Sequence, residues 1–88
     1  MRQCETINYL QAKSKWGDKV GELASAALVV IQGIDDTNMT DKDIQYLHDI
    51  VQHVYEEGGR SLLEDLRYGA KECAVCAEMV KQIEALGI

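Results

Sequence analysis

The chain of 88 residues contains no proline and no phenylalanine. Proline is the residue that most strongly breaks a helix, so its absence leaves helical segments uninterrupted. The breaks in the apolar pattern fall instead at glycines and at one polar loop, residues 35–40. Elsewhere the apolar residues recur at helical rather than alternating spacing. The sequence therefore predicts an all-α fold, a small helical bundle of three or four helices.

The sequence also lacks a long apolar run and an even set of cysteines. Its longest apolar stretch, residues 23–31, is far shorter than the roughly 20 residues that a membrane-spanning helix needs. Residues 2–6 are polar and contain no apolar segment of the signal-peptide type. Three cysteines do not pair into a disulfide framework. We therefore expect a cytoplasmic protein that does not bind membranes.

The length of the chain limits its core. A chain of this size buries only about 60–65% of the surface that its unfolded form exposes. With phenylalanine absent, Leu, Ile, Val and a single Trp must supply most of the burial. We expect one helical domain, residues 1–88, and a homodimer, because self-association covers apolar surface that a thin core leaves exposed.

The charge of the chain is acidic and unevenly spread. The formal net charge is −6 with a pI near 4.7, but residues 1–20 carry +2 and the remainder carries −8. Direct binding to nucleic acid requires clustered cations, which only the first segment has. We therefore predict no direct contact with nucleic acid. One alternative function is an acidic decoy that inhibits a nucleic-acid-binding protein, as small phage inhibitors do.

The first half of the chain has a clear apolar stripe but an ambiguous break. Ser14 and Gly17 could separate two helices within residues 3–32 or merely bend one long helix. Thr40 and Asp43 have the spacing of a capping box, which predicts that the next helix begins at about Asp41. The apolar stripe before the loop consists of Val20, Leu23, Ala24, Ala27, Leu28 and Ile31.

The second half predicts an antiparallel αα-hairpin. Its helices should cover about residues 41–57 and 60–86, because Gly58 and Gly59 permit the chain to reverse between them. Gly69 interrupts the second helix and could kink it. The expected inward stripe of that helix consists of Leu62, Leu63, Leu66, Ala70, Cys73, Cys76, Ala77, Val80 and Ile83.

The segment Cys73-Ala74-Val75-Cys76 is the one motif with chemical content. A redox pair needs an electropositive setting such as a helix N-terminus, whereas the expected helix places this motif in its middle. Tetrahedral zinc needs further ligands, which Cys4 and either His48 or His53 could supply from other helices. We interpret the cysteines as small apolar core residues and predict no metal and no cofactor. The alternative is a zinc-stabilised helical module in which Cys4, Cys73, Cys76 and His48 are the candidate ligands.

No group of residues indicates catalysis. The sequence has no glycine-rich phosphate loop and no local Cys–His arrangement, so we predict that the protein is not an enzyme. Tyr9 and Trp16 are candidate interface anchors, because such side chains concentrate binding energy. Gly17, Gly21 and Ser25 recur at every fourth position, which fits either a tight crossing inside the molecule or a dimer interface. We expect a protein–protein interaction module, a small regulator, adaptor or inhibitor whose partner the sequence does not identify.

Overall fold

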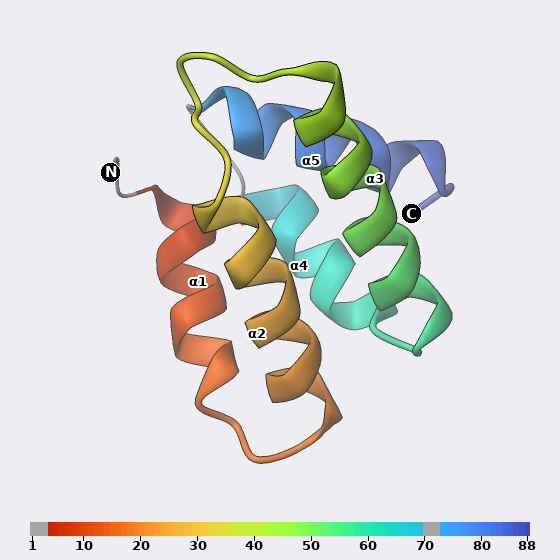
Figure 1. Ribbon diagram of the computed structural model, residues 1–88. Helices are drawn as coiled ribbons and strands as arrows, with labels where there is room; N and C mark the ends of the chain where they lie inside the picture. Colours follow the sequence, from red (N-terminus) through yellow and green to blue (C-terminus); the bar gives the residue numbers. More distant parts are fainter. Residues whose placement is uncertain (1–3, 70–72) are drawn as a thin grey trace.

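The computed structural model describes residues 4–69 and 73–88, and these form five α-helices (Figure 1). The predicted all-α class is confirmed, but the predicted number of three or four helices is too small for the residues described. The extra helix comes from the segment that was expected to form one helix over residues 60–86. The helices are α1 (Glu5–Ser14), α2 (Lys19–Gln32), α3 (Asp41–Glu56), α4 (Arg60–Gly69) and α5 (Ala74–Ala85).

Helices α1 and α2 are separate and lie side by side in opposite directions (Figure 1). Helix α2 begins directly after Asp18, which is its N-cap residue. The Asp18 side chain accepts a 3.2 Å hydrogen bond from the backbone N–H of Gly21. Gly21 is buried, and a Cβ at this position would overlap the carbonyl oxygen of Trp16. The close approach of the turn to α2 therefore requires glycine at residue 21.

The capping box predicted at the start of α3 is confirmed. The Thr40 hydroxyl accepts from the Asp43 amide at 3.2 Å, and the Asp43 carboxylate accepts from the Thr40 amide at 3.0 Å. At the other end, Gly58 has φ of +88°, a conformation that other residues rarely adopt. The chain reverses there, and α4 runs back from the end of α3 (Figure 1).

The helix expected over residues 60–86 is in fact two helices. Helix α4 ends at Gly69, and Cys73 has the extended backbone of an N-cap residue before α5, with φ of −129° and ψ of 155°. Because the helix starts afresh, the inward face of α5 is shifted from the predicted stripe. Val75, Cys76, Met79 and Ile83 are buried, whereas Ala77 is exposed and Val80 is half-buried; Ala70 lies outside the described residues.

All five helices contribute to one core. The buried residues of the predicted stripes meet there, with Leu10 and Ile7 added from α1 and Met79 and Val75 added from α5. Among the residues that the structure describes, no helix combines the length and apolarity that crossing a bilayer requires. The fold brings the N-terminal ends of α1 and α5 close to one another, and this meeting point is the candidate site.

Candidate metal centre

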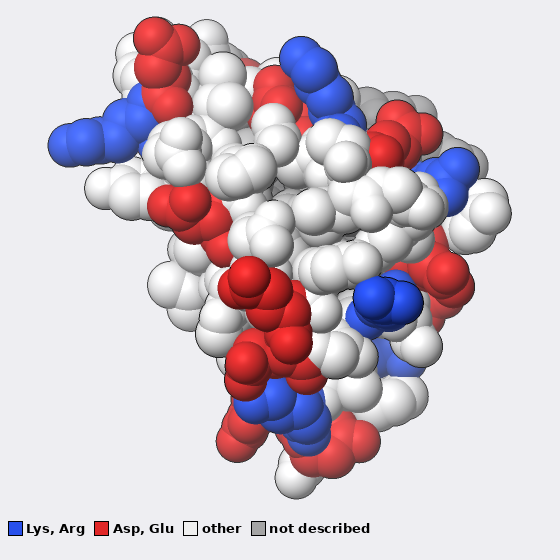
Figure 2. Space-filling model, turned by 90° about the vertical axis from the view of Figure 1, so that its right-hand side faces the viewer, with Lys and Arg blue, Asp and Glu red and all other residues white. Residues whose placement is uncertain are grey.

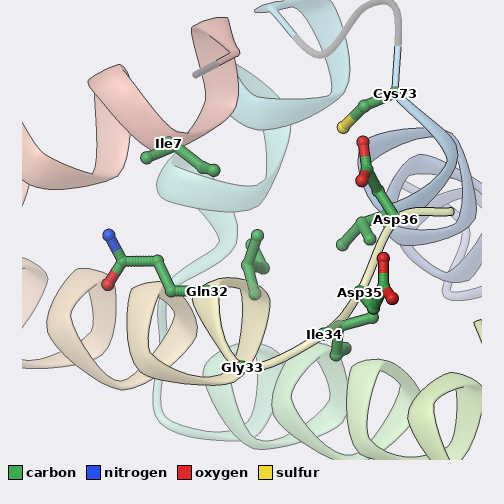
Figure 3. A pocket seen from close by; sticks show the side chains of 9 residues that line it. Ile7, Gln32, Gly33, Ile34, Asp35, Asp36 and Cys73 are labelled. Carbon is green, nitrogen blue, oxygen red and sulfur yellow. The ribbon is translucent and has the colours of Figure 1, made fainter. Parts of the chain in front are cut away.

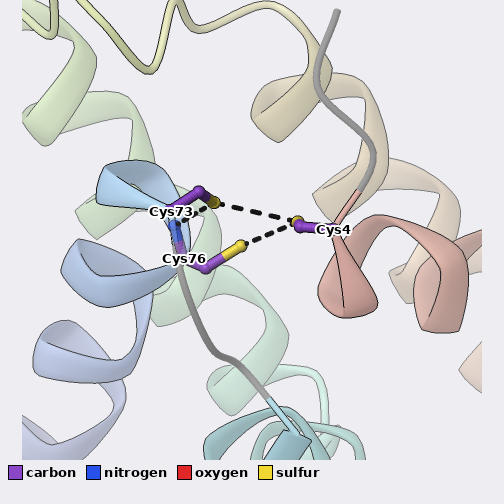
Figure 4. A group of neighbouring side chains, drawn as sticks. All are labelled: Cys4, Cys73 and Cys76. Carbon is purple, nitrogen blue, oxygen red and sulfur yellow. Dashed lines mark hydrogen bonds between the residues drawn. The ribbon is translucent and has the colours of Figure 1, made fainter.

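The three cysteines of the chain come together although they are far apart in sequence (Figure 4). The Cys4 sulfur lies 3.1 Å from the Cys76 sulfur and 3.8 Å from the Cys73 sulfur. All three Sγ atoms lie within 4.8 Å of one another. This is the spacing at which three side chains can contact one ion.

Two helix N-termini position these thiols. Cys4 is the N-cap residue of α1, Cys73 is the N-cap residue of α5, and Cys76 lies in the first turn of α5. The Cys73 sulfur accepts a 3.3 Å hydrogen bond from the Cys76 amide. The expectation that this motif lies in the middle of a helix is wrong. Since a helix N-terminus has partial positive charge, both helices favour negative charge on the sulfurs.

The cluster is largely shielded from solvent. Cys76 has no exposed surface, and Cys73 is 8% exposed. Cys4 is partly exposed as a whole residue, but its sulfur is buried with the other two. Buried thiolates are unfavourable without compensating charge, so the site is suited to a cation.

The surroundings push the thiol pKa values in opposite directions. Burial acts to raise the pKa of Cys4, but hydrogen bonds from Cys76, Cys73 and the amides of Ile7 and Thr6 bring it below its usual value. The Cys4 side chain makes no cap hydrogen bond to these amides, so we attribute their effect on its pKa to the dipole at the start of α1. Burial raises the pKa of Cys76, and its contacts with Cys73 and Cys4 add to that effect.

Thr6 adds an unusual polar group beside the sulfurs. Its side chain is only 1% exposed, and its hydroxyl makes no hydrogen bond of standard geometry with the described residues. The same hydroxyl is near enough to Cys76 to oppose the rise in the pKa of that thiol. We therefore interpret Thr6 as a donor directed at the sulfur, at a longer distance than an ordinary hydrogen bond.

The structure does not bring a histidine into this cluster. His48 is exposed on α3, and its Nδ1 lies 3.0 Å from Oε1 of Gln82 on α5. His53 is exposed one turn later on α3. Within residues 4–69 and 73–88, the group with metal-binding geometry consists of Cys4, Cys73 and Cys76.

The candidate interface anchors are at the surface of α1 and the turn that follows it. The Tyr9 hydroxyl donates a 2.7 Å hydrogen bond to Asp65 on α4, so part of this side chain is already engaged within the molecule. Trp16 is 51% exposed, and the Lys13 ammonium lies 3.6 Å from its ring centroid. Their role as interface residues stays a prediction.

The three small residues do not share one helical face. Gly17 lies in the turn before α2 and is exposed, Gly21 is buried in the first turn of α2, and Ser25 is half-buried further along that helix. The contact between Gly21 and the Trp16 backbone is a tight crossing within the molecule. A Cβ at Gly17 would meet nothing within 4 Å, so no packing requires glycine there.

A cavity of about 320 Å³ adjoins the cluster (Figure 3). Cys73 belongs to the thiol cluster and also lines the cavity. Its sulfur points toward the space between Ile7 and Asp36. Apart from the acidic loop after α2, nothing in the sequence indicated this cavity, because its walls come from three separated segments. The other lining residues are Ile31, Gln32, Gly33, Ile34, Asp35 and Val75.

The charges on the face drawn in Figure 2 alternate in sign. Acidic groups are the more frequent, but Lys and Arg side chains and uncharged residues separate them. This face therefore does not provide the continuous acidic surface that a decoy of nucleic acid would use. The decoy hypothesis stays a prediction for the rest of the surface.

The chain matches no known protein family, no curated protein and no solved structure. The interpretation of the site therefore depends on the geometry described above.

Proposed function

We propose that Cys4, Cys73 and Cys76 bind a zinc ion and that the protein is a metal-stabilised helical module. The observation that carries this proposal is the convergence of three thiols within 4.8 Å from two ends of the chain. Thiolates are soft ligands, and they favour zinc over the hard cations calcium and magnesium. The interpretation of Cys73 and Cys76 as core residues was based on their place in the predicted apolar stripe, and both are buried. The argument against a reactive pair was based on a position in the middle of a helix that the motif does not have.

The distances suit zinc with a small adjustment. Zinc–sulfur bonds of about 2.3 Å at tetrahedral angles place the sulfurs about 3.8 Å apart. The distance between the Cys4 and Cys73 sulfurs is already 3.8 Å. The 3.1 Å between the Cys4 and Cys76 sulfurs would have to lengthen by about 0.7 Å. A side-chain rotation of Cys4 at the start of α1 is sufficient for such a change.

The surroundings also supply what bound thiolates need. The N-termini of α1 and α5 favour negative charge, which helps each thiol to lose its proton when the ion binds. The Thr6 hydroxyl can donate to the Cys76 sulfur and so orient it. A water molecule or another donor would complete the fourth coordination position.

Binding would connect elements that share little other surface. Helix α1 packs mainly against α2, and α5 packs mainly against α3 and α4. An ion held by Cys4 and by the two cysteines of α5 would fix the first helix to the last one. We therefore expect its main effect to be on the stability of the fold.

The direct test is metal binding by protein purified without chelator. We expect about one zinc per chain and, after exchange into cobalt(II), the strong thiolate charge-transfer absorption of a sulfur-bound ion. Cys4→Ser, Cys73→Ser and Cys76→Ser should each weaken binding, whereas the control Ala77→Ser, at an exposed position on the same helix, should not. Absence of stoichiometric zinc together with absence of the cobalt absorption would contradict the proposal.

A second proposal is that the protein acts as an interaction module and forms a homodimer. It is supported by exposed apolar side chains on α2 and α3, where Val29 is 71% exposed and Tyr46 is 50% exposed. These two residues flank a shallow apolar groove that Val30 and Ile34 also line. The test is the mass in solution over a dilution series. A monomer at all concentrations, unchanged by Val29→Asp, would contradict the homodimer.

A further inference from the structure

We propose that the metal-free thiols react by thiol–disulfide exchange with small, positively charged aliphatic disulfides that enter the cavity beside Cys73. Cys73 is the attacking thiol and Cys4 the thiol that resolves the mixed disulfide. This inference goes beyond zinc binding and does not depend on it, since it concerns the protein after treatment with a chelator.

The position of Cys73 identifies it as the attacking residue. It is the cysteine that lines the cavity of about 320 Å³, and its sulfur is directed into that space (Figure 3). The sulfur also accepts the hydrogen bond from the Cys76 amide at the N-terminus of α5. This donor stabilises the negative charge that the sulfur carries during attack. A disulfide held in the cavity therefore meets Cys73 before it meets either of the other thiols.

A second thiol is in place to complete the reaction. The Cys4 sulfur lies 3.8 Å from the Cys73 sulfur and faces it from the start of α1 (Figure 4). An attack over this distance requires only a small movement of Cys4, the N-cap residue of α1. The product is a disulfide that links the start of α1 to the start of α5.

The atoms and electrons balance without any other reagent. The Cys73 thiol loses its proton to solvent, and its sulfur attacks the substrate R–S–S–R, forming Cys73–S–S–R and releasing one R–S⁻. Cys4, after losing its own proton, attacks the Cys73 sulfur and releases the second R–S⁻. The two leaving thiolates take up the two protons, so two protein thiols are oxidised and the substrate is reduced to two R–SH.

The lining of the cavity selects the charge of the substrate. Asp35 lies at its edge, and its carboxylate is held by hydrogen bonds from the Thr37 amide at 3.0 Å and the Thr37 hydroxyl at 2.7 Å. Asp36 is a second lining carboxylate (Figure 3). The apolar walls suit short alkyl chains, and the Asp35 carboxylate attracts ammonium groups and repels carboxylates. The walls are Ile7, Ile31, Ile34 and Val75.

The test compares three disulfides of similar size that differ in charge. They are cystamine, which is cationic, hydroxyethyl disulfide, which is neutral, and dithiodipropionate, which is anionic. The rate of thiol loss from chelator-treated protein is divided by the rate for the same protein unfolded in urea, which removes differences in intrinsic reactivity. We expect the normalised rate for cystamine to exceed that for the neutral disulfide by about tenfold at low salt, and the anionic disulfide to be slowest. Added salt should reduce the difference.

Two sets of variants assign the residues. A variant that keeps only Cys73 (Cys4→Ser with Cys76→Ser) should retain the preference for cystamine and accumulate the mixed disulfide, whereas one that keeps only Cys4 (Cys73→Ser with Cys76→Ser) should lose the preference. Asp35→Asn should lower the rate with cystamine more than the rate with hydroxyethyl disulfide, so that the preference for cystamine falls. Asp49→Asn, which alters an exposed acid on α3, is the matched control.

The outcomes separate this inference from zinc binding. Equal normalised rates for the three disulfides, or equal preference in the variant that keeps only Cys4, would overturn it even if zinc binds. Absence of zinc binding together with the expected charge preference would leave it supported. In the unaltered protein the final product should be the Cys4–Cys73 disulfide on peptide mapping; a product that pairs Cys73 with Cys76 would overturn the role of Cys4.

Discussion

The Tyr9 hydroxyl donates a 2.7 Å hydrogen bond to the carboxylate of Asp65, which connects α1 to α4. Partial burial raises the pKa of the Tyr9 phenol, and the hydrogen bond and negative charge of Asp65 raise it further. The protonated phenol is therefore part of the folded structure.

Tyr9→Phe should make the protein less stable at neutral pH and less sensitive to alkali. In the unfolded chain Tyr9 ionises near pH 10, whereas in the folded protein it stays protonated to higher pH. Its contribution to the free energy of unfolding is thus complete below pH 10 and is lost as the pH rises above that value. Urea denaturation between about pH 7 and pH 11 should give a loss of about 1 kcal/mol at the neutral end and a shallower alkaline decline. Tyr46→Phe, at a half-exposed position, is the control and should preserve the decline.

Gly21→Ala should destabilise the monomer, and Gly17→Ala should not. A Cβ at Gly21 overlaps the Trp16 carbonyl oxygen, whereas a Cβ at Gly17 has open space around it. We expect a loss of about 1–3 kcal/mol for Gly21→Ala by chemical denaturation. The change at Gly17 should lie within about 0.5 kcal/mol. If both variants instead keep their stability and shift the monomer–dimer equilibrium, the small residues form an interface and not an internal crossing.

Cys4→Ser and Cys73→Ser should preserve or raise the stability of the protein without zinc. With zinc, each variant should be less stable than the unaltered protein. Serine is a stronger N-cap than cysteine, so in chelator each variant should be as stable as the unaltered protein or more stable by up to about 1 kcal/mol. With free zinc at a hundredfold excess over Kd, the unaltered protein should gain about 2.7 kcal/mol and the variants much less. Thermal melts with zinc and with EDTA measure this difference. Equal melting temperatures for the unaltered protein under the two conditions would contradict the zinc proposal.

Thr6→Val separates a structural role of the buried hydroxyl from a role in the site. The valine side chain has a similar shape and removes a polar group that lacks a standard hydrogen bond. The metal-free protein should therefore become more stable by about 1 kcal/mol. Zinc affinity, measured by competition with a chromogenic chelator, should fall by about tenfold or more, because the donor next to the Cys76 sulfur is lost. Unchanged affinity would show that Thr6 does not support the site.

Most of the secondary structure could be predicted because local signals determine it. The capping box at Thr40 and Asp43 and the turn at Gly58 and Gly59 occur where the sequence indicated. The division of the last segment was missed, since its apolar spacing continues through the interruption and Cys73 is not a residue typical of an N-cap. The consequence was an inward face shifted to Val75 and Met79.

The site was harder to predict because its members are distant in sequence. The three cysteines that the structure brings together were among the candidate ligands, but two of them were expected within a helix, and His48, also a candidate, lies beside Gln82 instead. Nothing local indicates that the start of α1 meets the start of α5. That contact depends on how five helices pack, which spacing along the chain does not encode.

The order in which the thiols are synthesised has a consequence for the living cell. Cys4 and Cys76 are 72 positions apart, so at ordinary translation speeds a ribosome needs roughly 4 to 14 s to produce the second after the first. During that interval the Cys4 thiol is not covered by Cys76. A chaperone, glutathione molecule or copper ion that binds Cys4 in those seconds does so before Cys76 has been synthesised.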